Sequence, residues 1–179
     1  MLEKNKVVLS ESDQLEMQFL ALTELQDYDK ELLEVQEENM ELATFDSVNF
    51  DSLLGDNSVS YITFKLFKQY NFLDSYFIDV EVLLNFTREA QMAYFKENPY
   101  HNVLHVIDSL QGLHFMLTHG NLKRYLKKHD TFAGFVACLI LDFEHPGYTN
   151  QFVVRTKHPL AIRYSDISVL ENHHLAAGF

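Results

Sequence analysis

Apolar side chains recur every three or four positions along most of this sequence, and this spacing constrains its fold more than any other feature. Only three prolines and six glycines interrupt the 179 residues, so the elements can be long. Recurrence at three to four residues places apolar side chains on one face of a helix. The sequence therefore predicts an all-α fold, and the chain is long enough to bury one core but too short for two large domains.

The expected helices can be placed along the chain. Apolar residues at helical steps predict one helix with a single apolar stripe over residues 13–42. A break rich in Asp, Asn, Ser and Gly follows at residues 46–57. Further helices are predicted over residues 58–70 and 79–97, with a turn at Asn71 between them.

The run of apolar residues at 132–141 has few β-branched members and predicts a helix that Asp130 or Thr131 can cap. Because this run is apolar on all sides, we expect the helix to be buried. It would bring Asp142 to the edge of the core. Pro146 and Gly147 then end the element.

Negative charge is concentrated near the N-terminus. Residues 1–58 hold 15 of the 26 acidic residues and only three basic ones. We interpret residues 1–45 as an acidic helix and linker, and residues 46–179 as the domain. The acidic helix either contacts a protein partner or is a linker that orders only against the domain. The net charge of −12 disfavours direct binding to nucleic acid or to an anionic membrane.

Cysteine content and hydropathy indicate the cellular compartment in which the protein is expected. Cys138 is the only cysteine, so an internal disulfide is impossible. The first residues lack the apolar stretch of a secretory signal, and the longest apolar run, at 132–141, is too short to span a bilayer. We therefore expect a reducing, cytoplasmic setting and no membrane association.

Polar residues with ligand chemistry begin at His101, His105 and Asp108. On a helix these three fall within an arc of roughly 60°. An ordinary solvated face that happens to carry two imidazoles explains the same pattern. The other residues of this kind that we single out are Asp142, Glu144, His145, Glu171, His173 and His174.

Together these residues predict a metal centre. A packed helical core would not keep so many imidazoles and carboxylates without a purpose, and both groups are usual ligands of zinc and of harder divalent ions. Two ions held close together would bind the attacking and the leaving oxygen of a phosphoester displacement. Glu171 also has a structural explanation, because Ser168 and Glu171 match a capping box.

In three ordered blocks the sequence resembles the class I cyclic-nucleotide phosphodiesterases. The blocks are Tyr100-His101-Asn102 with His105 and Asp108, then Asp142 with His145-Pro146-Gly147 and Asn150, then Tyr164, Asp166 and residues 168–174. The resemblance extends over about residues 45–179 and looks most like the cyclic-AMP-type branches. It implies the N-terminal part of a multi-helix, HD-like catalytic domain that hydrolyses a 3′,5′-cyclic nucleotide, cyclic AMP rather than cyclic GMP, to the 5′-monophosphate.

The resemblance also implies cofactors and roles. A hydroxide held between a zinc ion and a second divalent ion, commonly magnesium, would attack phosphorus. By position, His101 would be the general acid that protonates the departing O3′, His105 would be a zinc ligand, and Asp142 would bridge the two ions. His145 and Glu171 would hold metal-bound waters or orient His101. Tyr100 and Asn150 would shape the substrate pocket.

The sequence departs from the family pattern at Leu141, where the family has a metal-binding histidine. The family domain also continues past the block that ends at His174, and that part supplies a further metal-binding aspartate and the residues that bind the purine. Only His105 and Asp142 then remain of the four expected zinc ligands, whereas a catalytic zinc normally has three protein ligands. We therefore expect weak zinc binding and impaired hydrolysis.

Two alternatives to an enzyme of this family stay open at this stage. One is a non-catalytic relative that binds a partner or a cyclic nucleotide, which Leu141 favours. The other is an unrelated helical metal-dependent phosphohydrolase, which would make the spacing of the three blocks a coincidence.

Overall fold

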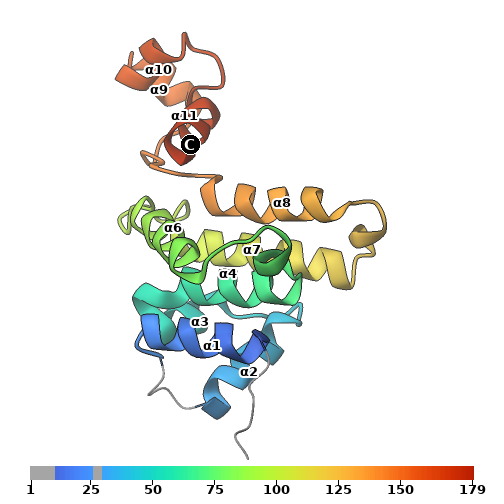
Figure 1. Ribbon diagram of the computed structural model, residues 1–179. Helices are drawn as coiled ribbons and strands as arrows, with labels where there is room; N and C mark the ends of the chain where they lie inside the picture. The colour runs from blue at the N-terminus through green and yellow to red at the C-terminus, as the bar shows by residue number, and fades with distance from the viewer. Residues whose placement is uncertain (1–10, 26–29) are drawn as a thin grey trace, which may run out of the picture.

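The computed structural model describes residues 11–25 and 30–179, and within these ranges it contains helices, turns and loops but no strand (Figure 1). The all-α prediction is therefore confirmed. The elements are α1 (Glu11–Leu22), α2 (Lys30–Met40), α3 (Ser47–Leu54), η2 (Gly55–Asn57), α4 (Ser58–Gln69), α5 (Phe72–Ser75), α6 (Val80–Met92), α7 (Val103–Thr118), η3 (Leu122–Arg124), α8 (Lys128–Ile140), α9 (Asn150–Arg155), α10 (Pro159–Arg163) and α11 (Val169–Gly178). In the part of the chain just defined, no helix has both the length and the apolar character that crossing a bilayer requires.

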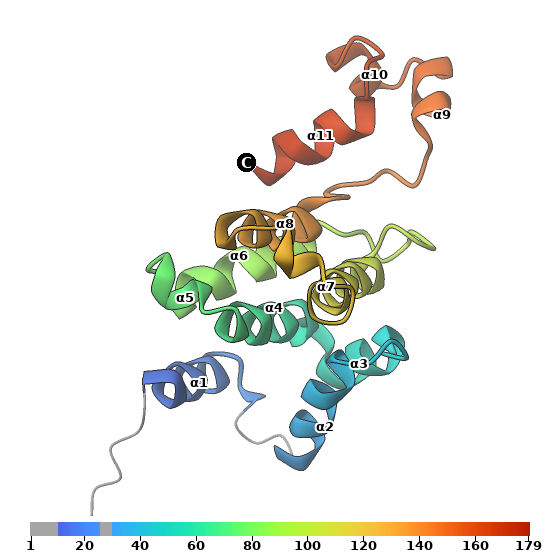
Figure 2. The ribbon, with the colours of Figure 1, turned by 90° about the vertical axis from the view of Figure 1, so that its right-hand side faces the viewer.

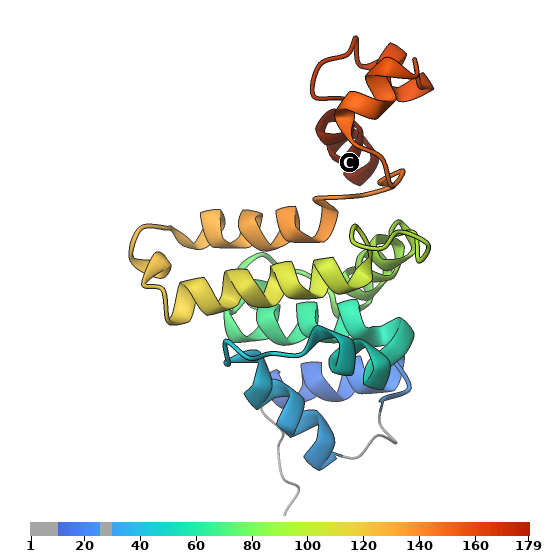
Figure 3. The same ribbon diagram turned by 180° about the vertical axis from the view of Figure 1, so that it is seen from behind.

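The main body is built around α4, which contacts α3, α6 and α7, while α8 lies along α7 on the side away from α4 (Figures 1 and 3). Residues 58–64, 66 and 67 of α4 are all buried. Its core side chains include Ile62, Phe64 and Phe67, none of which is more than 2% exposed. Burial of apolar side chains on every face makes α4 the central helix of the core.

The structure corrects the prediction for α8. Phe135 and Leu139 are buried, but Ala133 and Ala137 on the opposite face are exposed. The helix therefore has a covered face and an open face, because a run of apolar letters does not reveal how many neighbours pack around it. The helix also begins earlier than predicted, at Lys128 with Lys127 as its N-cap, and the Asp130 carboxylate accepts a hydrogen bond from the backbone N–H of Lys127 (2.9 Å) from inside the first turn.

The predicted single helix over residues 13–42 is also wrong. Two helices, α1 and α2, occupy this stretch, and α1 ends in a turn at residues 23–25 where Glu24 has a left-handed φ of 59°. Residues 26–29 lie outside the described residues. Phe19 of α1 is fully buried and stacks on Phe64 of α4 with ring centroids 4.1 Å apart. Glu16, on the same helix, forms ion pairs with Lys65 and Lys68 of α4.

Helices α9, α10 and α11 project from the main body beyond the end of α8 (Figure 2). They bury a small apolar cluster of their own, made of Val153, Ala161, Val169 and Leu170. The C-terminal part of α11 returns to α8, where a Cβ atom on Gly178 would lie 3.0 Å from Ile140. This contact brings the second half of α11 to the point where the chain leaves α8.

Candidate metal centre

The first histidines of the centre lie at the start of α7. Asn102 is the N-cap of this helix, and its side-chain oxygen accepts a hydrogen bond from the N–H of Leu104 (3.0 Å). His101 therefore precedes the helix, while His105 lies in its first turn. The prediction that His101, His105 and Asp108 share one helix is wrong, because His101 lies before the helix begins. Asp108 lies one turn after His105 and is exposed.

Asp142 lies in the turn after α8 and is 7% exposed. Tyr94, which follows α6, holds this turn, because its hydroxyl donates to the Leu139 carbonyl (3.0 Å) and accepts from the Asp142 N–H (3.3 Å). A buried carboxylate without partners would be costly. Each carboxylate oxygen of Asp142 has a histidine side chain within 4.0 Å.

The distances around Asp142 define the cluster. His101 Nδ1 lies 2.8 Å from Oδ2 of Asp142, and His105 Nε2 lies 3.4 Å from the same oxygen. On the other side, His174 Nε2 is 4.0 Å from Oδ1. The structure thus places the start of α7, the turn after α8 and helix α11 around one carboxylate.

His145 completes the centre by stacking. Its ring stacks on the His101 ring with centroids 3.7 Å apart. The centroid of the His174 ring lies 5.4 Å from that of His145. Burial, reinforced by the neighbouring His101, lowers the pKa of His145 to about 4, although the Asp142 carboxylate opposes this effect. Its Nδ1 accepts a hydrogen bond from the Gly147 N–H (3.0 Å), so the neutral ring carries its hydrogen on Nε2.

His173 and His174 differ in their partners. The His174 Nδ1–H donates to the Phe143 carbonyl (2.6 Å), and burial lowers the pKa of His174. His173 instead pairs with Glu144 through its Nε2, 3.0 Å from Oε2. Glu144 is exposed and has a left-handed φ of 53°, so its side chain turns away from Asp142 toward α11.

Glu171 and Asn150 form a separate unit. The Asn150 Nδ2 group donates to both carboxylate oxygens of Glu171 at 3.0 Å, while its Oδ1 accepts from the Leu170 N–H (3.0 Å). The backbone and Asn150 hydrogen bonds lower the pKa of Glu171. Ser168 makes no side-chain cap, so the predicted capping box does not form, and Asn150 caps α11 instead.

Two residues that support the centre were not identified from the sequence. Asn98 donates from Nδ2 to the carbonyls of His145 (2.7 Å) and His101 (3.2 Å), which joins the two segments that carry the cluster. Tyr94 fixes the Asp142 turn as described above. The adjoining Tyr100 ring, which is 60% exposed, lies 4.5 Å from the ring of His105. Asn98 stands two residues before the Tyr100 motif, but its role depends on a contact 47 residues away.

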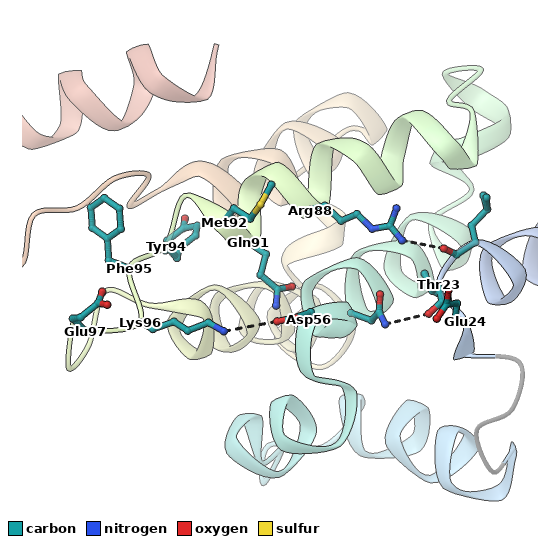
Figure 4. A pocket seen from close by; sticks show the side chains of 12 residues that line it. Thr23, Glu24, Asp56, Arg88, Gln91, Met92, Tyr94, Phe95, Lys96 and Glu97 are labelled. Atoms are coloured by element: carbon teal, nitrogen blue, oxygen red, sulfur yellow. Dashed lines mark hydrogen bonds and ion pairs between the residues drawn. The ribbon is translucent and has the colours of Figure 1, made fainter.

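A pocket of about 710 Å³ is lined by none of the residues of this centre (Figure 4). Its lining includes Thr23, Asp56, Arg88, Gln91, Met92 and Phe95. Tyr94 also lines the pocket, and its hydroxyl contacts the Asp142 backbone. The pocket and the cluster are therefore neighbours that share Tyr94, but the ligand chemistry lies in the cluster.

The ligand chemistry of the cluster fits a divalent metal ion. The nearest nitrogen or oxygen atoms of His101, Asp142 and His145 all lie within 4.8 Å of one another. The hydrogen on Nε2 of His145 argues against this ring as a direct ligand and makes it a donor instead. His105 and Asp142 supply one imidazole nitrogen and one carboxylate oxygen at 3.4 Å, a separation that two ligands of one ion can have.

Comparisons with known proteins show the family to which the chain belongs. Residues 100–179 match the family model described as 3′5′-cyclic nucleotide phosphodiesterase. The chain is 34% identical to the mouse dual specificity calcium/calmodulin-dependent 3′,5′-cyclic nucleotide phosphodiesterase 1C over 137 residues. These residues are 76% of this chain and 19% of that protein. A probable 3′,5′-cyclic phosphodiesterase of Caenorhabditis elegans is 35% identical over 137 residues, 76% of this chain and 21% of that protein.

A third relative, the mouse 3′,5′-cyclic-AMP phosphodiesterase 4C, is 35% identical over 127 residues, which is 71% of this chain and 18% of that protein. The chain thus spans about a fifth of the length of the curated relatives it matches. The matched residues 100–179 include the start of α7, the turn after α8 and helix α11, which carry the cluster.

Proposed function

Because residues 100–179 form part of a class I 3′,5′-cyclic nucleotide phosphodiesterase domain, we propose that this protein hydrolyses a 3′,5′-cyclic nucleotide to the 5′-monophosphate. The observation that carries the proposal is the convergence of His101 and His105 on the buried carboxylate of Asp142. These groups come from segments about 40 residues apart in the sequence, and a purely structural role would not require two imidazoles at one carboxylate.

The metal ligands in this proposal are His105 and Asp142. Zinc is the proposed ion at these two residues, and magnesium is the proposed second ion, sharing Asp142. A divalent ion bound here would polarise a phosphoryl oxygen and favour the ionised form of an attacking water. Asp142 is suited to this position because it is buried and held by the Tyr94 hydroxyl through its backbone.

His101 is the proposed general acid. Its Nδ1 is hydrogen-bonded to Asp142, so the carboxylate fixes the ring orientation and leaves Nε2 as the nitrogen that would pass a proton to the substrate. Transfer of that proton to O3′ would complete cleavage of the O3′–phosphorus bond. Stacking against His145 keeps the His101 ring from rotating away from its partner.

The other site residues have supporting roles in the proposal. His145 offers its Nε2–H to a phosphate oxygen or a water, and Glu171 orients waters near the rings of His145 and His174. Asn150 acts through Glu171, which it holds by two hydrogen bonds. Tyr100, with its ring beside His105, forms part of the substrate pocket.

We propose cyclic AMP rather than cyclic GMP as the substrate. One relative carries cyclic AMP in its name and another is named as having dual specificity, so cyclic AMP is the choice compatible with both. The proposed setting is the cytoplasm. We also propose that the acidic helices of residues 1–45, which pack on residues 46–179 through Phe19, offer a surface to a protein partner.

An alternative function is non-catalytic binding. Leu141 favours it, because this half-buried side chain directly precedes Asp142 and has no atom that can bind a metal ion. In this alternative the chain binds a cyclic nucleotide or a partner protein without hydrolysing anything. The two functions differ in turnover and in their response to a histidine at position 141.

The test is hydrolysis of cyclic AMP and cyclic GMP by two proteins. The first is this chain, and the second is mouse phosphodiesterase 1C in which residues 100–179 of this chain replace the matching segment. We expect negligible turnover from the isolated chain, low turnover from the chimera, and a clear rise when the chimera carries Leu141→His. His101→Ala in that chimera should reduce kcat by about 10²- to 10⁴-fold. A folded Leu141→His chimera that binds cyclic AMP without any turnover would support the binding alternative.

A further inference from the structure

We propose that a second cavity, at one end of the main body, binds a small phosphate ester, and that Lys123 and Lys128 contact its charged group. The cavity has a volume of about 400 Å³, and its lining comes from the end of α4, from η3 and from the start of α8. Figure 3 shows how η3 joins the end of α7 to the start of α8. No lining residue belongs to the cluster around Asp142, so the inference does not rest on the proposed function.

The charge of this cavity is opposite to that of the chain. The net charge of the chain is −12, whereas the described residues that line the cavity include Lys123 and Lys128 and no carboxylate. Neither ammonium group forms an ion pair with a carboxylate in the described part of the chain. By contrast, Lys65 and Lys68 of α4 both pair with Glu16. Two cations that border one cavity without a counter-ion create a positive potential that attracts an anion.

Two carboxylates that contact residues near this cavity are already bound to other groups. Oε1 of Glu41 accepts a hydrogen bond from Nε2 of Gln69 (3.0 Å) and lies 2.9 Å from Nε2 of His114. Asp130, in the first turn of α8, accepts a hydrogen bond from the Lys127 N–H. Because these carboxylates are held by other partners, they leave the charge of the cavity available to a ligand.

Tyr70 gives the cavity a fixed aromatic wall. Its hydroxyl is hydrogen-bonded to Nδ1 of the fully buried His114 (3.0 Å), and its ring stacks on Phe72 with centroids 5.6 Å apart. Burial raises the pKa of Tyr70 to about 12, so the phenol is uncharged at neutral pH and does not repel an anion. Nζ of Lys123 lies 5.9 Å from the centroid of the Tyr70 ring. A ligand with an apolar group can therefore pack on this wall while Lys123 contacts its anionic end.

The charge and the size of the cavity favour a phosphate ester over a simple carboxylate. A phosphate monoester carries a charge of about −1.5 to −2 at neutral pH and has three strong acceptor oxygens. Two lysines match that charge, and lysine binds phosphate as a compact point charge. Asn71 also lines the cavity, and because its side chain does not cap α5, its amide is a further donor. A cavity of about 400 Å³ is larger than a phosphate ion requires, which leaves room for the esterified group.

The test is isothermal titration calorimetry of the metal-free chain with phenyl phosphate at neutral pH and low salt. We expect a Kd of about 1 mM or lower. Lys123→Gln and Lys128→Gln should each weaken the affinity by about tenfold, because each removes a charge-assisted contact. Their chain neighbours provide matched controls, since Arg124→Gln and Lys127→Gln remove the same charge from positions outside the lining. These two controls should weaken the affinity by less than about twofold, because exposed charges at a distance are screened.

Two further probes test the chemical class of the ligand. Benzoate carries the same ring with a single negative charge, and it should bind about tenfold more weakly than phenyl phosphate. Inorganic phosphate lacks the ring and should also bind more weakly, because it makes no contact with the Tyr70 wall. Lys123→Arg retains the charge and should retain most of the affinity that Lys123→Gln loses. All four replaced side chains are exposed, so we expect every variant to fold, and circular dichroism checks this.

The outcomes are distinct from those of the proposed function, because none of them depends on hydrolysis. A loss of affinity confined to Lys123→Gln and Lys128→Gln would support the site. Equal losses in these variants and in the two controls would show a diffuse effect of charge and would overturn it, as would the absence of phenyl phosphate binding up to about 10 mM. Benzoate bound as tightly as phenyl phosphate would overturn the choice of a phosphate ester. Binding that His101→Gln abolishes would lie at the histidine cluster and would also overturn the inference.

Discussion

The low pKa of His145 predicts that the metal-free protein loses stability on mild acidification. Burial and the adjacent His101 lower the pKa of this ring from its ordinary value of 6.5 to about 4 in the folded state. Between these two values the unfolded chain binds a proton that the folded chain does not. The free energy of unfolding should therefore be unaffected by His145 above pH 6.5 and should fall as the pH decreases toward 4.

The size of this effect follows from the two pKa values. Each pH unit between them corresponds to about 1.36 kcal/mol, which gives a ceiling near 3 kcal/mol for the full interval. We expect about 2 kcal/mol of loss at pH 4.5, because the native ring already begins to protonate there and the centre is partly open to solvent. The lowered pKa of His174 acts in the same direction.

Urea unfolding followed by circular dichroism measures the effect. The metal-free chain and His145→Gln are compared at pH 7 and pH 4.5 with a chelator present. Carboxylates such as Glu171, whose pKa is also lowered, contribute in both proteins, so the difference between the two pH dependences reports the removal of His145. Equal pH dependence in the two proteins, within about 0.5 kcal/mol, would refute the neutral, buried state of this ring.

Three further predictions concern neighbouring residues. Leu141→His should raise Zn²⁺ affinity by about tenfold or more in calorimetry, equivalent to about 1.4 kcal/mol, and an unchanged affinity would mean that position 141 cannot reach the ion. Asn98→Ala should destabilise the chain by about 1–2 kcal/mol in urea, since two carbonyls lose their donor, while Asn57→Ala, which removes a single bond to Thr23, should cost less. Asn150→Ala should cost about 1 kcal/mol through loss of the α11 cap, seen as a lower Tm, and no shift would argue against that cap.

The sequence was sufficient to predict the helical class and the helices α4, α6 and α8, because their apolar spacing is regular. The predicted break at residues 46–57 is wrong, since α3 (Ser47–Leu54) and η2 (Gly55–Asn57) occupy it. The prediction of Asn71 as a turn is confirmed, since it has a left-handed φ of 54° between α4 and α5. The N-terminal prediction failed at residues 23–25, where the apolar repeat continues through a break in the backbone. A spacing pattern records which side chains are apolar, whereas the break lies where the backbone of Glu24 takes a left-handed φ of 59°.

The sequence singled out residues that the structure partly brings together. His101, His105, Asp142 and His145 do lie together, while Glu171 is held by Asn150. The sequence could not distinguish His173 from His174, because adjacent residues on a helix point in different directions and only the tertiary structure decides which one meets Asp142. Their different partners, Glu144 for the first and the Phe143 carbonyl for the second, make that distinction.

The frame of the centre does not depend on the side chain at position 141. The turn after α8 is held by backbone contacts on either side of Leu141, from the Tyr94 hydroxyl to the Leu139 carbonyl and the Asp142 N–H. The Glu144 N–H donates to the Ala93 carbonyl (2.9 Å), which fixes the far end of the same turn. Exchange of the residue at 141 can therefore add or remove a metal ligand without displacing Asp142. A Leu141→His variant that gains metal affinity while its urea midpoint stays the same would be the direct sign of this separation, and a large loss of stability would show that leucine itself supports the turn.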